Sequence, residues 1–149
     1  MNRWALIGGL FAMGCGGGSA PRFEPANNVV PVSGLLTYQG KPLPYFQLTF
    51  MSKDGSTHTA GGRTDASGNF ILGTNIPGDG ASVGKYLIGA VFVGAPEEDN
   101  SASKVFSSEP EVLPKPTIQI PTKYNNPKTS FVEVDVPAGG LVNYKLDLQ

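Results

Sequence analysis

The sequence has few of the side chains that usually perform chemistry. Its 149 residues include one cysteine and one histidine, and only 15% are charged. A single cysteine excludes a disulfide within the chain, and a histidine-rich zinc site or a Ser-His-Asp triad would have to be built around His58. A net charge of −1 offers no basic face for nucleic acid. The composition therefore predicts no catalytic residues, no metal, no cofactor and no nucleic-acid partner.

Glycine and proline, by contrast, are abundant. The 20 glycines and 13 prolines argue against long helices and favour many short strands joined by turns. The length leaves room for one domain together with targeting and linker segments.

The first 14 residues have the pattern of a secretory signal. Arg3 gives a short basic start, and an apolar run too short to span a bilayer follows it. The end of this segment, Phe11–Cys15, resembles a bacterial lipobox, in which the signal is cut before a cysteine that then receives lipid. Gly14 and Cys15 fit that pattern, whereas Ala12 departs from it because a branched aliphatic residue is usual there. The alternative is an ordinary signal peptide with a chance cysteine.

The residues that follow predict a tether. Residues 15–29 are rich in glycine, serine and proline, and as a flexible coil they would reach roughly 20 Å. Gly16 replaces the aspartate that favours inner-membrane retention in some bacteria, which tilts the expected location towards the outer membrane. We therefore predict a signal peptide over 1–14, a linker that begins at a lipidated Cys15, and a domain over 30–149.

The stretch Val32–Phe50 predicts an opening strand, a tight turn at Gln39–Pro42 and a returning strand. Apolar and polar residues alternate along both halves, so the two strands can lay their apolar faces on one core. A weak strand at Thr57–Thr64, with a bulge at Gly61-Gly62, would follow. An Asp65–Gly68 turn would lead to a strand at Asn69–Leu72.

The remainder predicts a central strand, a long loop and a closing hairpin. Gly84–Val93 is apolar on both faces, as is typical of a doubly covered strand. Gly94–Pro127 is a proline-rich loop whose one strand-like piece is 117–120, and Ile118, Ile120 and Tyr124 are expected to pin it to the domain. Segments 132–136 and 142–148 alternate and are predicted to pair. The count predicts an all-β fold, an antiparallel Greek-key β-sandwich of six or seven strands.

Three segments give the chain a family resemblance. They are VSGLLTYQGKPL at Val32–Leu43, DASGNF at Asp65–Phe70 and GKY at Gly84–Tyr86. These resemble the carboxypeptidase regulatory-like, or transthyretin-like, domains of small bacterial lipoproteins, and 120–130 is similar to the C-terminal part of the same proteins. The resemblance implies a seven-stranded sandwich on a lipid anchor and assigns no activity.

Two turn sequences are candidates for a calcium site. Asp54-Gly55-Ser56 and Asp65–Asn69 carry oxygen atoms suited to calcium, but they are also ordinary turn sequences and lack the EF-hand spacing. Glu97–Asp99 is another cation candidate, although a solvated acidic loop is the commoner interpretation.

A Lys–Asn isopeptide crosslink is a further alternative, with the candidate residues Lys41, Lys145, Asn143 and Asn69.

Four aromatic residues form the last candidate site. Tyr38, Tyr45, Phe46 and Tyr124 would suit an aromatic platform for sugar, although core packing explains at least half of them. We therefore expect a non-enzymatic, lipid-anchored cell-envelope protein that packs against or recognises another envelope component. The alternative is a carbohydrate- or peptide-binding module shaped by the 94–127 loop.

Overall fold

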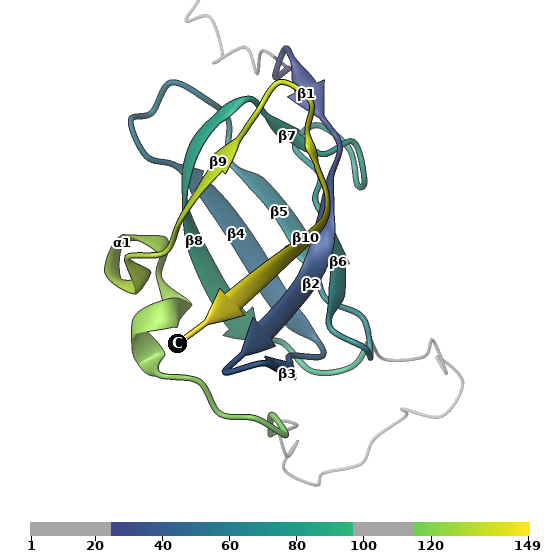
Figure 1. Ribbon diagram of the computed structural model, residues 1–149, viewed down its shortest axis with the longest axis vertical. Helices are drawn as coiled ribbons and strands as arrows, with labels where there is room; N and C mark the ends of the chain where they lie inside the picture. Colours follow the sequence, from purple (N-terminus) through teal and green to yellow (C-terminus); the bar gives the residue numbers. More distant parts are fainter. Residues whose placement is uncertain (1–24, 97–114) are drawn as a thin grey trace, which may run out of the picture.

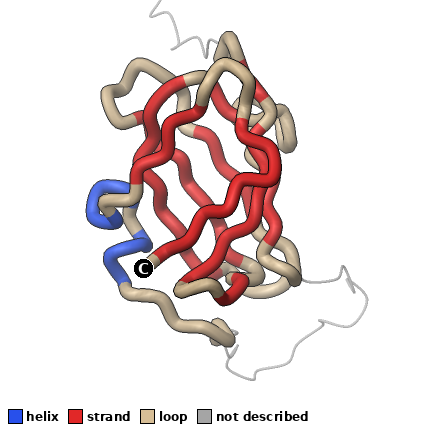
Figure 2. Tube along the Cα trace, in the orientation of Figure 1, coloured by secondary structure: helices blue, strands red, loops and turns tan. Residues whose placement is uncertain are grey.

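The computed structural model describes residues 25–96 and 115–149, which form an all-β fold with two short helices (Figures 1 and 2). The strands are β1 (Val29–Val30), β2 (Val32–Tyr38), β3 (Lys41–Pro42), β4 (Phe46–Ser52), β5 (Ala60–Arg63), β6 (Asn69–Ile71), β7 (Ala81–Ser82), β8 (Gly84–Phe92), β9 (Glu133–Val136) and β10 (Leu141–Leu148). The helices are the 3₁₀ helix η1 (Thr122–Asn125) and α1 (Pro127–Ser130). The predicted signal, Cys15 and the predicted acidic loop at Glu97–Asp99 lie outside the described residues.

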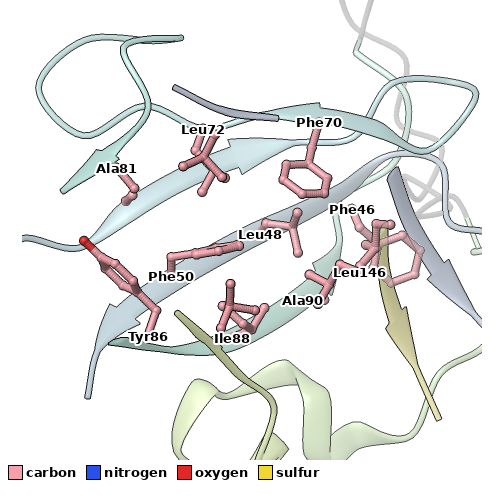
Figure 3. Close-up of a cluster of buried hydrophobic side chains, with 14 of the residues drawn as sticks. Phe46, Leu48, Phe50, Phe70, Leu72, Ala81, Tyr86, Ile88, Ala90 and Leu146 are labelled. Carbon is pink, nitrogen blue, oxygen red and sulfur yellow. The ribbon is translucent and has the colours of Figure 1, made fainter. Parts of the chain in front are cut away.

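Two four-stranded sheets supply one hydrophobic core. The first has the order β10-β2-β3, with β6 also paired to β2, and the second has the order β5-β4-β8-β9. Phe50 and Tyr86 of the second sheet and Phe70 of the first belong to the same buried cluster (Figure 3). The ring centroid of Phe50 lies 6.4 Å from that of Phe70 and 5.9 Å from that of Tyr86. Side chains of both sheets therefore exclude water together.

The opening stretch contains the predicted turn but not the predicted strand pair. Gln39 and Gly40 adopt positive φ, and β3 returns beside the end of β2. The chain then leaves this sheet, and β4 pairs with β5 and β8 of the other one. Phe46 and Phe50 are buried as expected. The predicted pairing of the two strands was therefore wrong. Alternation of apolar and polar residues shows that one face of a strand is buried, but it does not show to which sheet the strand belongs.

The closing pair of strands is also divided between the sheets. β9 pairs with β8, whereas β10 pairs with β2 and runs parallel to it. The expectations of a closing hairpin and of wholly antiparallel pairing are therefore wrong. The β10 register shifts between Leu141 and Tyr144, and Val142 at this irregularity is 63% exposed instead of facing the core. Leu146 and Leu148 are buried as predicted.

The predicted bulge at Gly61-Gly62 is not present, since the β4–β5 register runs through it without a shift. A side chain at Gly62 would put its Cβ 2.5 Å from the carbonyl oxygen of Ile71. Gly61 exchanges backbone hydrogen bonds of 2.9 and 2.8 Å with Gly73. These glycines therefore allow the edges of the two sheets to approach each other.

Residues before and after the main strands also pack on the fold. Ala26 is buried, and its backbone exchanges hydrogen bonds of 2.7 and 3.1 Å with the Asn75 side chain. The folded part therefore reaches into the segment assigned to the tether. The predicted strand-like piece at 117–120 is not a strand, but Ile118 and Ile120 pack on the core and Tyr124 is buried, as their pinning role predicts.

Candidate functional site

The two turn aspartates accept hydrogen bonds from their own turns. Asp65 Oδ1 accepts from the backbone N–H groups of Ser67 and Asn69 at 2.8 and 2.9 Å. Asp54 Oδ1 accepts from the backbone N–H and the hydroxyl of Ser56 at 2.9 and 2.5 Å. The Oδ1 atom of each candidate calcium ligand therefore accepts hydrogen bonds from its own turn.

The pKa values follow from these contacts. The Ser56 hydroxyl, and then its backbone N–H, lower the pKa of Asp54. Burial acts to raise the pKa of Asp65, but hydrogen bonds from the side chain and backbone of Asn69 and from Ser67 lower it overall. Both carboxylates are stabilised in the ionised form by turn donors. Across residues 25–96 and 115–149, no group of three His, Cys, Asp or Glu side chains could hold a metal ion.

His58 lies on the surface, as its polar neighbours predicted. It lines an open cavity of about 440 Å³. The other described lining residues carry hydroxyl, amide or aliphatic side chains: Asn27, Asn28, Ser56, Thr57, Ser82 and Val83. The hydroxyl of Thr57 is buried and has no hydrogen-bond partner among the described residues.

The candidate crosslink residues lie on the surface of one sheet, where Asn69 and Asn143 line one open pocket and Lys145 and Asn69 flank Leu35 on the neighbouring strands. Lys41, Lys145, Asn69 and Asn143 are all exposed. Asn69 donates through Nδ2 to Asp65 Oδ2 at 3.2 Å, and Asn143 has a φ of 58° at the β10 irregularity. A spontaneous Lys–Asn crosslink forms near a buried acid, and these positions do not offer that setting.

The four candidate aromatics do not form an exposed platform. Phe46 and Tyr124 are 2% exposed, and Tyr38 and Tyr45 are half-buried. Tyr38 makes an edge-to-face contact with Tyr124 at 6.4 Å, and Phe46 makes one with Phe92 at 5.4 Å. Packing within the fold accounts for Phe46, Tyr124 and Tyr38, which agrees with the expectation that core packing explains at least half of the four.

A groove of about 280 Å³ lies beside the end of the long loop and is the strongest candidate for ligand binding. It lies between the end of β8 and the segment 116–125 that packs against it. The lining residues are mostly apolar, with two amides: Phe46, Val91, Phe92, Pro116, Gln119, Ile120 and Asn125. The wall of the groove exposes about as much polar as apolar surface, and apolar side chains beside a few polar groups suit a small organic ligand.

The sequence predicted that the 94–127 loop would shape a binding site, but it did not predict that Val91, which lines the groove, is exposed. Val91 is 39% exposed and Val93 is 45% exposed, although both belong to the most apolar segment of the predicted domain. Their alternation with the buried Ala90 was the available signal. It was overlooked because the segment was expected to be covered on both faces.

Comparisons of the chain with family models, curated proteins and solved structures found no match. Within the part of the chain that the structure describes, no helix has the length and apolar character needed to cross a bilayer.

Proposed function

We propose that the protein is a non-enzymatic, lipid-anchored cell-envelope protein whose folded domain contacts another envelope component. The observation that carries this proposal is the apolar N-terminal segment that ends in Phe11–Cys15. Two or three acyl chains on Cys15 would give stable anchoring, because one chain alone binds a bilayer only marginally. On this proposal the signal exports the domain across the inner membrane, and Gly16 favours the outer membrane.

The domain is, on this proposal, a Greek-key β-sandwich of the carboxypeptidase regulatory-like type. Its support comes from two four-stranded sheets that share one core and from the Asp65–Phe70 turn, whose first side chain accepts backbone hydrogen bonds. The resemblance assigns no activity, which suits an interaction role.

The anchor is tested by replacing Cys15 with serine. In a host that processes lipoproteins, we expect the wild-type protein in the membrane fraction to have lost residues 1–14 and gained acyl mass. We expect Cys15→Ser to carry no acyl mass and to appear in the soluble fraction, because a hydroxyl does not accept the thioether-linked lipid. Intact-protein mass spectrometry of both fractions measures both results.

A substitution at Ser19, four residues after Cys15, is a matched control. Ser19→Ala should leave the processing and the acyl mass unchanged. An unmodified Cys15 thiol in the wild-type protein would contradict the anchor and make the protein a freely secreted one.

The groove favours a second candidate function, a carbohydrate- or peptide-binding module. If the groove binds such ligands, peptidoglycan fragments, which carry both sugar and peptide, should raise the melting temperature. Val91→Asp should abolish that increase because it puts a charge on the apolar wall, whereas Val142→Asp on the other sheet should retain it. An equal increase for the two variants, or none for the wild type, would rule out this site.

A further inference from the structure

The most exposed large apolar side chain among the described residues is Phe131. It is 84% exposed and directly follows α1, at a φ of 55° and a ψ of 17°. Glycine is the usual residue in this left-handed conformation at a helix end, because a Cβ makes it costly. A phenylalanine at this position is therefore unfavourable in two ways, because its apolar ring is exposed to water and its backbone is left-handed. Residues held in unfavourable backbone conformations cluster at functional sites.

The phenylalanine is displayed on a firmly packed support. Ser130 donates its hydroxyl hydrogen bond to the carbonyl oxygen of Ile88, and Pro127 packs over Gly89 of β8. A Cβ on Gly89 would lie 2.7 Å from the ring of Pro127. Because α1 is held against a central strand in this way, Phe131 projects from a fixed position.

The same segment carries one sign of charge. Residues 115–132 contain three lysines, Lys115, Lys123 and Lys128, and no acidic residue. The next acid along the chain, Glu133, is already paired with Lys53 at 2.5 Å. The local excess of positive charge stands against a net charge of −1 for the whole protein.

The two short helices carry Lys123 and Lys128 and lie against each other. Thr129 of α1 donates from its hydroxyl to the carbonyl oxygen of Lys123 at 2.7 Å, which joins α1 to η1. Figures 1 and 2 show both helices side by side at one edge of the molecule, outside the sheets. Lys123, Lys128 and Phe131 are all exposed on these adjacent helices and the residue after them, and we call the three together the basic aromatic patch.

We propose that the basic aromatic patch binds the surface of a bilayer that contains anionic lipid. Lysines near such a surface are attracted to the headgroups, and an exposed aromatic ring beside them can enter the interface. This inference rests on the proposed anchor, which would hold the domain at a membrane. Pro25, the first described residue, is ten positions after Cys15, so the tether can extend roughly 35 Å at most. That reach is comparable with the diameter of a domain whose expected radius of gyration is about 14 Å, so the patch can be turned towards the bilayer.

The test uses the full chain with Cys15→Ser, so that acylation does not mask the contribution of the patch. Sedimentation with phosphatidylcholine vesicles, with and without phosphatidylglycerol, measures binding. We expect tighter binding to the anionic vesicles and a loss of about 30-fold in Lys123→Gln/Lys128→Gln. The matched control, Lys85→Gln/Lys145→Gln, removes two exposed lysines elsewhere and should bind like its parent.

A second variant separates binding from folding. Phe131→Gly should weaken vesicle binding about tenfold, yet its melting temperature should not fall, because glycine relieves the left-handed backbone. Ile76→Asn, which removes an apolar side chain that is 66% exposed in another loop, should leave binding unchanged.

Three results would overturn the proposal. They are equal binding by the two double-lysine variants, a lowered melting temperature in Phe131→Gly, and preference for an acidic protein such as polyglutamate over anionic vesicles. The anchor is judged separately, by acyl mass on wild-type Cys15, so failure of the patch and failure of the anchor give different results.

Discussion

Gly34→Ala is expected to destabilise the protein by at least about 3 kcal/mol, which would lower the melting temperature by roughly 10 °C. A Cβ at Gly34 would lie 1.9 Å from the carbonyl oxygen of Tyr144 and 2.8 Å from its carbonyl carbon. The φ of Gly34 is not positive, so the penalty comes from this contact and not from backbone strain. Relief requires β10 to move away from β2, and their parallel pairing fixes Tyr144 opposite Gly34. Urea and thermal unfolding of the two proteins would measure the effect.

A second glycine supplies the control for this experiment. Gly139 has no positive φ, and a Cβ there would meet nothing within 4 Å. Gly139→Ala should therefore leave the free energy of unfolding within about 0.5 kcal/mol of the wild type. If the two alanine variants were equally stable, the close approach of β10 to β2 would be wrong.

Local patterns in the sequence predicted the local structure well. The alternation around Leu36, Leu48 and Phe70 identified buried positions, because a strand with one buried face must repeat every two residues. The Asp65 turn also followed from its residues, since a short carboxylate can accept the N–H groups that a turn leaves free. These features depend on residues that are neighbours in the chain.

The assignment of strands to sheets could not be predicted in the same way. β4 and β9 have patterns that suit either sheet, because both sheets bury one face against the same core. The parallel pairing of β10 with β2 joins segments that are more than 100 residues apart, as Leu146 opposite Leu36 shows. The need for glycine at position 34 arises only from that pairing. No short-range signal encodes it.

The candidate site shows the same division. The loop and its pinning residues Ile118, Ile120 and Tyr124 were predicted from an apolar pattern within a proline-rich segment. The exposure of Phe131 was not, because its neighbours in the sequence, Ser130 and Val132, give no sign that the chain turns left-handed there. A side chain that departs from its local preference can be recognised only once the fold is known.

Tyr124→Ala is expected to cost about 3–5 kcal/mol in the free energy of unfolding, as for other large buried aromatics. Tyr124 is 2% exposed and packs edge-to-face against Tyr38, and its hydroxyl accepts from the backbone N–H of Gln149 at 3.1 Å and donates to the carbonyl oxygen of the same residue. It therefore joins the end of the long loop to the strand that ends the chain. Denaturant unfolding would measure the loss.

Tyr124→Phe separates the two contributions, because it keeps the ring and removes the hydroxyl. We expect this variant to lose about 1 kcal/mol, the usual net value of a hydrogen bond. The alanine variant should also release Ile120 and Gln119 from the groove wall, so amide hydrogen exchange there should rise more than in the sheets. Equal stability of the alanine and phenylalanine variants would mean that the ring does not hold the loop. The groove would then lack the support that makes it a fixed binding surface.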